Sequence, residues 1–438
     1  MTDNKLNLAP DVLETGSGMY KLMGELYPIC RSITGNGLRQ SLRIIQTHIP
    51  LELHEVPTGT PVFDWTVPKE WNIQDAYVRG PGGEKVIDFQ RSSLHVVNYS
   101  LPIRARMPLD KLKEHLHSIP EHPDWVPYRT SYYKENWGFC LSHRTLQSLE
   151  EGEYEVVIDS SLEEANLTYG ECYVKGTTTD EILISSHCCH PSLCNDNLSG
   201  MVLATFLAKN LHRPKLRYSY RFILAPGTIG AITWLARNEN TTSRIKHGLV
   251  IACVGDKGPF KYKKSRRGDA DIDKAAVHAL KHSGQAYAVS EFTPYDYDER
   301  QYCSPGFNLP VGSLTRTPHD CYPENHTSAD NMDFVTPESL AGSFQLYSTV
   351  LEILEKNKRY LNTNPKCEPR LGKRGLYGAF GGKRDANTYE LAMQWTLNFS
   401  DGHHTLLEIA EKSGFRFEVI KEAASTLVEH NLLVEAGA

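Results

Sequence analysis

Three hydrophobic runs constrain the fold of this 438-residue chain more than any other feature of its sequence. Each run ends in polar residues: EILISSHCCH (181–190), YRFILAPGTIG (220–230) and HGLVIACVGDKG (247–258). Helix-like stretches lie among and after them, notably at 199–211 and 341–357. Alternating strands and helices predict an α/β sheet that is covered on both faces. In such sheets ligands bind beyond the carboxyl ends of the strands, where these polar residues would lie.

The sequence outside these runs predicts two N-terminal helices, a β-rich segment and a C-terminal winged helix. Residues 17–49 have apolar positions at helical spacing on both sides of a Gly-containing break, which indicates two helices. A mainly β segment with Pro and Gly turns follows, and LLEIAEKSGFRFEVIKEAASTLVEHNLL near the C-terminus is typical of a winged helix. We therefore expect an α/β domain at 1–60 plus 176–365, an inserted β-rich domain at 61–175 and a winged-helix domain at 366–438.

Composition and charge narrow the class of protein. The formal net charge is -6 and the isoelectric point is near 6.3, so there is no electrostatic reason to expect nucleic acid or an anionic membrane as the main partner. The N-terminus has no basic region followed by an apolar stretch, and the chain has no run of about 18 apolar residues. We therefore expect a soluble, cytoplasmic protein. The ten cysteines are scattered, so we expect most of them to be reduced and buried.

The segment SSHCCHPSLCNDNLSG (185–200) directly follows the core of the first hydrophobic run and concentrates potential metal ligands. A structural zinc site usually takes four ligands from two separated knuckles, whereas this segment is a single cluster without CxxC spacing. Adjacent cysteines also form a strained redox pair. The sequence therefore disfavours both a zinc finger and a redox centre.

A catalytic metal site is the third interpretation of this segment. His187 ends the predicted strand and Asp196 precedes the predicted helix, and a neutral imidazole with a carboxylate suits zinc. Taken alone, a helix cap at Asn195 or Asp196 and a buried structural histidine explain the pattern equally well. Asp256 ends the third hydrophobic run, and His326 lies in the polar loop PENHTSADNMDF. Four such residues at successive strand–helix junctions favour a metal site.

The order and spacing of these residues resemble the zinc aminopeptidase superfamily, which includes bacterial leucyl aminopeptidases and glutamate carboxypeptidases. The segments SHCCHPSLCNDNLSG, CVGDKGPFKYKKSRRGD, DERQYCSPGFNLPVGSLTR and HTSADNMDFV are similar to those of a bacterial aminopeptidase-like subfamily. Its members carry an inserted β domain and a C-terminal winged helix, and they are often linked with polysaccharide-biosynthesis loci. The resemblance spans nearly the whole chain. It implies an aminopeptidase-like fold with a doubly wound mixed α/β sheet, a sandwich-like insertion and a winged helix.

The resemblance also implies a ligand set for one or two zinc ions. His187 and Asp256 would bind one ion, His326 would bind the other, and Asp196 would bridge them. Such proteins carry a glutamate in a Pro-Glu-Thr-Ile-Gly setting, where this chain has Gly227 in the sequence PGTIG. Gly227 can neither bind a metal nor accept a proton, and general base catalysis is worth about 10²–10⁴ in rate.

The catalytic residue is therefore left unassigned by the sequence. Glu299 and Glu324 are candidates from nearby polar loops, although a solvated loop charge is the plainer interpretation of each, as it is of Asp298. We interpret His190 and His319 as loop or supporting residues rather than ligands.

A basic strip, KYKKSRR at 261–267, follows the predicted strand that ends at Asp256 and suggests that the substrate carries an anionic group. Arginine has a planar guanidinium that suits a carboxylate, and a solvated loop explains the strip equally well. The residues that we expect to bind substrate are Tyr262, Arg266, Arg267 and Arg300.

These observations favour a zinc-dependent, aminopeptidase-like hydrolase that cleaves an amide bond in a small amino-acid or peptide-like substrate. The alternative is a protein that lost catalysis at Gly227 and uses the fold for binding or scaffolding. A DNA-binding regulator ranks third, because residues 401–435 carry three basic and seven acidic side chains and phosphate contacts need basic ones. We expect this module to dock or to form a homo-oligomer, with the basic patch at 373–384 as the one feature against that view.

Overall fold

The structure is a computed structural model that describes residues 11–211, 215–376 and 384–437, excluding the side chains of 384–387. Its contacts divide the chain into two units. The first holds Met1–Ala270 and Ala286–Gln345, and the second holds Asp271–Gln285 and Leu346–Ala438. Each unit is described here by itself.

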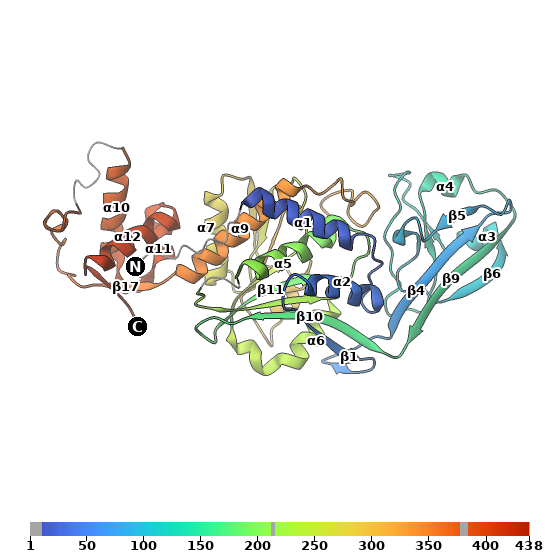
Figure 1. The fold of residues 1–438 in the computed structure, drawn as a ribbon, viewed down its shortest axis with the longest axis horizontal. Coiled ribbons are helices and arrows are strands. Elements are labelled where there is room, and N and C mark those ends of the chain that lie inside the picture. Colours follow the sequence, from blue (N-terminus) through green and yellow to red (C-terminus); the bar gives the residue numbers. More distant parts are fainter. Residues whose placement is uncertain (1–10, 212–214, 377–383, 438) are drawn as a thin grey trace. The chain divides into compact units, whose positions relative to one another are not determined.

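An eight-stranded mixed sheet forms the centre of the first unit (Figure 1). Its four middle strands are parallel, and antiparallel pairs occur toward both edges. In spatial order the strands are β1 (Glu52–Pro57), β10 (Asn166–Val174), β12 (Ser219–Ala225), β11 (Glu181–His187), β13 (Ile245–Ile251), β16 (Val311–Thr315), β14 (Phe260–Lys263) and β15 (Tyr287–Ser290). The three hydrophobic runs form β11, β12 and β13, so the predicted α/β sheet is confirmed.

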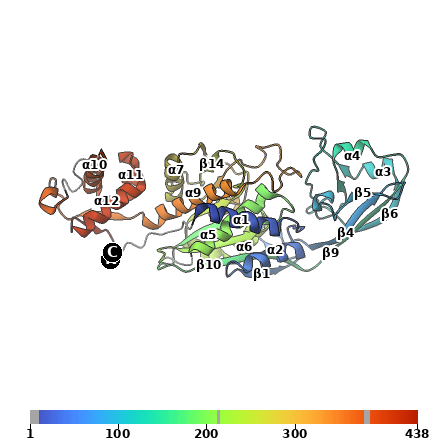
Figure 2. The ribbon, with the colours of Figure 1, turned by 45° about the horizontal axis from the view of Figure 1, so that its top comes forward.

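Helices cover both faces of this sheet, which explains why its central strands are continuously hydrophobic. Every residue of β11 and β12 is buried. Helix α5 (Ser199–Leu211) packs on one face beneath α1 (Val12–Leu26), and α6 (Ile229–Asn238) packs on the other, as Figures 1 and 2 show. Helix α2 (Asn36–Gln46) follows α1, so the two helices predicted for residues 17–49 are present.

The inserted segment, expected to be sandwich-like, contains one four-stranded antiparallel sheet and two small two-stranded sheets. The order of the four-stranded sheet is β5 (Lys85–Asp88), β4 (Glu70–Arg79), β9 (Glu153–Glu163) and β6 (Ile103–Pro108). Helix α3 (Leu109–Lys113) and the short pair β7 (Leu116–His117) and β8 (Phe139–Cys140) supply the second layer, because their apolar side chains complete its core. A small hairpin, β2 (Pro61–Val62) and β3 (Trp65–Thr66), precedes the sheet, and η1 (Ser93–His95) and α4 (His143–Gln147) complete the segment. Strand β10, predicted inside the insertion, pairs with β1 and β12 in the main sheet instead.

The second unit contains the predicted winged helix. Its elements are α10 (Arg384–Phe399), α11 (Leu406–Ser413) and α12 (Phe417–Glu429), with a sheet in the order β18 (Asp401–Thr405), β17 (Arg359–Asn362) and β19 (Leu433–Glu435). Helix α7 (Asp271–His282) also belongs to this unit, and α9 (Pro337–Lys356) runs across the division. Because β17 lies before residue 366, the winged-helix sheet starts earlier than the sequence predicts. The expected basic patch at 373–384 falls mostly outside the described residues.

The expectations about membrane-spanning segments and about the cysteines can be compared with the described residues. None of their helices has both the length and the apolar character needed to cross a bilayer. The ten cysteines all lie in the part of the chain that the structure describes, where they form no disulfide, and seven of them are buried.

Candidate metal centre

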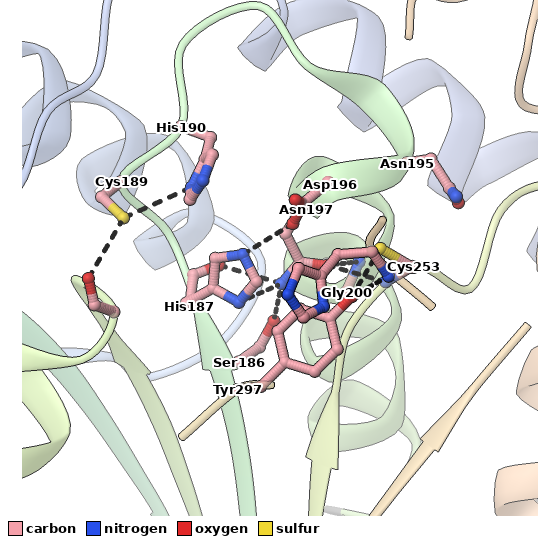
Figure 3. Close-up of polar contacts among 12 residues, drawn as sticks. Ser186, His187, Cys189, His190, Asn195, Asp196, Asn197, Gly200, Cys253 and Tyr297 are labelled. Carbon is pink, nitrogen blue, oxygen red and sulfur yellow. Dashed lines mark hydrogen bonds and ion pairs between the residues drawn. The ribbon is translucent and has the colours of Figure 1, made fainter. Parts of the chain in front are cut away.

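Three potential metal ligands converge just beyond the carboxyl end of β11 (Figure 3). His187 is the last residue of β11, and Asp196 lies in the turn η2 (Cys194–Leu198) that leads into α5. His187 Nε2 is 2.8 Å from Asp196 Oδ1. His190, in the connecting loop, completes a group whose ligating atoms all lie within 4.8 Å of one another. The structure thus brings His187 and Asp196 together and adds His190, which the sequence interpretation treated as a supporting residue.

His326 approaches the same carboxylate from the other side. Its Nε2 lies 3.2 Å from Asp196 Oδ2 and makes no hydrogen bond among the described residues. Its backbone has a φ of 53°, in the left-handed region. A loop of the insertion holds this conformation, because the backbone N–H of Tyr128 donates to the carbonyl of His326 at 2.7 Å. The insertion therefore takes part in positioning a candidate ligand.

The backbone around Asp196 is fixed by buried polar side chains. Asp330 accepts the backbone N–H groups of Asn195 and Asp196, at 2.6 and 2.9 Å. The Asn197 amide donates to the carbonyl oxygen of His187 at 3.0 Å and accepts the backbone N–H of Cys253 at 3.3 Å (Figure 3). Asp330 was missed in the sequence, although it lies four residues after His326 in a motif already singled out.

Electrostatic interactions stabilise an ionised Asp196 at the centre of this group. Burial alone would raise the pKa of Asp196, but His190, His187 and His326 hold it well below its usual value. Burial lowers the pKa of His190 to about 3, so this ring is neutral and able to bind a metal. For His326 burial favours the neutral ring, yet the interaction with Asp196 outweighs it and raises the pKa.

Asp256 does not join this cluster. Its carboxylate accepts the Asn195 amide at 3.0 Å, the Gly258 N–H at 2.6 Å and the Thr317 hydroxyl at 2.7 Å. These hydrogen bonds use the carboxylate to join loops at the end of the sheet. The assignment of Asp256 as a metal ligand stays a prediction.

A cavity of about 290 Å³ opens beside the cluster. His187, His190, Asp196 and His326 all line it. Its remaining walls combine aliphatic, aromatic, polar and charged residues, namely Ile33, Trp65, Tyr132, Tyr133, Gly227, Thr228, Ile229, Asp296, Tyr297, Asp298, Arg300 and His319. Tyr297 stacks on His187, with ring centroids 5.5 Å apart and planes 18° apart, which restrains the imidazole (Figure 3).

The position of the missing glutamate lies on the wall of this cavity. A Cβ atom at Gly227 would be 3.1 Å from the Cβ of His187 and 3.6 Å from Asp298 Oδ1. Asp298 is buried, and neither of its carboxylate oxygens has a hydrogen-bond partner among the described residues. Burial raises the pKa of Asp298 to about 7, against the opposing charge of His187. A carboxylate thus lies next to the space that a side chain at position 227 would enter.

The other two acidic candidates lie elsewhere. Glu299 is buried and ion-paired with Lys263 at 2.5 Å. Burial raises the pKa of Glu299, and Lys263 opposes this rise. Glu324 is not among the residues that line the cavity.

Of the four residues predicted to bind substrate, Arg300 lines the cavity, together with His319. Arg266 donates to the side chain of Asn308 at 3.0 Å, and Arg267 donates to the Asn308 carbonyl at 2.9 Å. Tyr262 is fully buried in β14. The structure therefore does not bring these three residues to the cavity.

Comparison with known proteins places these features in context. Residues 20–357 match the family described as "Domain of unknown function (DUF4910)", and residues 358–435 match a winged helix-turn-helix family. The chain is 56% identical over 422 residues, 96% of each protein, to a "Putative polysaccharide biosynthesis protein with aminopeptidase-like domain" from Clostridium acetobutylicum. It is also similar to the crystal structure of a putative peptidase from that organism, with a TM-score of 0.92, 54% identity and 97% of each chain covered.

More distant similarity concerns the fold alone. A zinc aminopeptidase from Bacillus subtilis matches with a TM-score of 0.56 at 12% identity, covering 77% of this chain and 94% of that one. A Shewanella amazonensis peptidase of the M28 class matches with a TM-score of 0.54 at 14% identity, covering 78% and 95%. The mixed α/β sheet is therefore an aminopeptidase-like fold.

Proposed function

This chain belongs to the family described as "Domain of unknown function (DUF4910)", and from that premise we propose that it is a zinc-dependent hydrolase. The reaction is cleavage of an amide bond in a small amino-acid or peptide-like substrate. The observation that carries the proposal is the convergence of His187, His190 and Asp196, with His326 beside them, on the wall of one cavity. We place the enzyme in the cytoplasm, in line with the sequence expectation.

The donor set fits zinc. Imidazole nitrogens and a carboxylate oxygen are typical zinc ligands, and three of them lie within 4.8 Å of one another. His187, His190 and Asp196 would hold one ion. Asp196 Oδ2 and His326 Nε2, which lie 3.2 Å apart, would serve a second. Zinc, when bound, supplies a Lewis acid for a substrate carbonyl.

The cavity supplies groups that would orient such a substrate. Arg300 lines it and has a buried Nε without a hydrogen-bond partner among the described residues, which suits a carboxylate of the substrate. Trp65 and Tyr133 are about half exposed, at 47% and 54%, and their rings lie 5.6 Å apart at the cavity wall. These rings offer an apolar contact for a side chain or a sugar ring. The volume of about 290 Å³ suits a small molecule.

Two parts of the proposal concern the setting of the reaction. The name of the Clostridium relative, a putative polysaccharide biosynthesis protein, supports a substrate that arises in polysaccharide assembly. The acidic balance of residues 401–435 supports a winged helix that docks on protein, including a second copy of this chain, rather than on DNA.

Hydrolysis by zinc-loaded and chelator-stripped protein tests the proposal. The substrates would be aminoacyl anilides, dipeptides and N-acylated amino sugars. We expect cleavage that requires zinc, that His187→Ala abolishes and that His115→Ala, a change in the insertion outside the cavity, leaves intact. Absence of cleavage by the parent, with cleavage gained by Gly227→Glu, would instead favour the binding or scaffolding protein.

A further inference from the structure

Asp298 is a buried carboxylate whose two oxygens have no hydrogen-bond partner among the described residues. It lies immediately before the short helix α8 (Glu299–Tyr302), is 1% exposed and lines the cavity. Neither oxygen accepts a hydrogen bond from any described residue. Removing a carboxylate from water without compensation costs several kcal/mol or more in general, so a fold keeps such a group where a ligand or a reaction uses it.

The place of Asp298 relative to the metal ligands defines what it can do. Through the open position at Gly227 it faces the His187 side of the cavity, since a Cβ there would lie 3.6 Å from Asp298 Oδ1 and 3.1 Å from His187 Cβ. It is nevertheless outside the group of His187, His190 and Asp196 whose ligating atoms lie within 4.8 Å. Asp298 is therefore beside the ligands and not one of them.

The other carboxylates of the cavity are already engaged. Asp196 lies 2.8 Å from His187 and 3.2 Å from His326. Asp296 forms an ion pair with Lys263 at 2.7 Å and lies 3.4 Å from His319. Among the described residues that line the cavity, Asp298 is the carboxylate whose lone pairs are open toward a ligand.

We infer that Asp298 is the general base of this site, a role that rests on the proposed hydrolase function. An Asp298 oxygen accepts a proton from the attacking water as the water oxygen bonds to the carbonyl carbon of the amide. When the carbon–nitrogen bond breaks, the protonated Asp298 returns that proton to the leaving nitrogen. The carboxylate is regenerated, and water is the only co-reactant.

The test compares wild type with Asp298→Asn, which keeps the shape and removes the basic oxygen. Glu291→Gln changes an exposed loop carboxylate that pairs with Lys264 and serves as the matched control. We expect Asp298→Asn to retain the zinc content of wild type and to lose about 10²–10⁴ in kcat. Asp298→Glu should recover part of that loss, which a purely structural role would not predict.

Two readouts do not depend on a known substrate. Acetohydroxamic acid passes its proton to a neighbouring base when it binds to a metal centre. Its Kd for zinc-loaded Asp298→Asn should therefore rise at least about tenfold over wild type, as the loss of one hydrogen bond to a charged group implies. The thermal midpoint of the metal-free Asp298→Asn variant should rise, because an unpartnered buried charge is removed.

The outcomes separate the two proposals. Unchanged zinc content with an unchanged rate, or an unchanged hydroxamate Kd, would overturn the role of Asp298 and leave the hydrolase intact. Loss of zinc from Asp298→Asn would show that it is a ligand, which also overturns the inference. A wild-type protein that binds no zinc and no hydroxamate would overturn the hydrolase and this inference together.

Discussion

At the residue scale, Glu70 shows how single buried charges tie the insertion to the main sheet. Its carboxylate accepts a hydrogen bond from Arg39 of α2 at 2.8 Å and another from the backbone N–H of Asn166 at 3.1 Å. Burial alone would raise the pKa of Glu70, but Arg39, Asn72 and Asn166 lower it to about 2. The ionised form is therefore the one that stabilises the folded chain.

This arrangement predicts acid sensitivity that depends on Glu70. The folded-state pKa lies below the usual 4.5, so the stabilisation is complete above about pH 4.5 and is lost as the pH falls toward 2. We expect Glu70→Gln to lower the free energy of unfolding at pH 7, and the gap from wild type to narrow by pH 3. Urea unfolding at several pH values measures this, with Glu121→Gln, an exposed change in a loop of the insertion, as the control. A gap that stays constant with pH would contradict the assignment.

The sequence could identify some site residues and not others, for physical reasons. His187 and Asp196 stand out because one ends a continuous hydrophobic run and the other precedes a helix. His190, Asp298 and Asp330 lie in loops, where no periodicity tells which way a side chain points or whether a charge is buried. Their place in the site depends on tertiary packing that local sequence does not encode.

At the element scale, the contact between an insertion loop and the His326 loop deserves a direct test. The backbone N–H of Val126 donates to the Ser328 hydroxyl at 3.0 Å, and the Ser328 N–H donates to the Val126 carbonyl at 2.8 Å. Together with the bond from Tyr128 to His326, these contacts fix the loop that carries a candidate ligand.

Replacing Ser328 by alanine leaves the buried N–H of Val126 without its partner. We expect Ser328→Ala to lower the free energy of unfolding by about 1–3 kcal/mol. It should also weaken zinc binding at the position served by His326, because the loop is less fixed. Ser148→Ala, an exposed serine at the end of α4, should change stability by less than about 0.5 kcal/mol. Equal effects of the two substitutions in denaturant titrations would argue against a specific contact.

Strands could be predicted from the sequence where nearly all of their residues are buried. They could be assigned less well where only strand pairing decides whether a strand belongs to the main sheet or to the insertion. Every residue of β11 and β12 is buried, as is every residue of β13 except Lys246, so hydrophobic runs dominate their sequences. Strand β10 directly follows the insertion strands along the chain, and its pairing with β1 and β12 is what places it in the main sheet. The second layer of the insertion is largely irregular, which strand patterns cannot reveal.

At the scale of the whole molecule, one sheet supports both a ligand cluster and a cavity that the insertion helps to line. The strand ends place His187 and Asp196, the insertion supplies Tyr132 and Tyr133, and the loop after β16 supplies His326. The aminopeptidase-like sheet and the inserted segment thus both contribute side chains to the site. For this reason the fold alone does not determine the substrate.

The zinc content per chain, measured by mass spectrometry on protein purified without a metal-affinity column, tests the central claim most directly. We predict one or two zinc ions in wild type and in Asp110→Asn, an exposed control in the first turn of α3. Asp196→Asn should lose at least one ion, because its amide replaces the ionised carboxylate that both histidines contact. A wild type without zinc even after zinc is supplied, or an Asp196→Asn variant with the full content, would contradict a metal centre built on this aspartate.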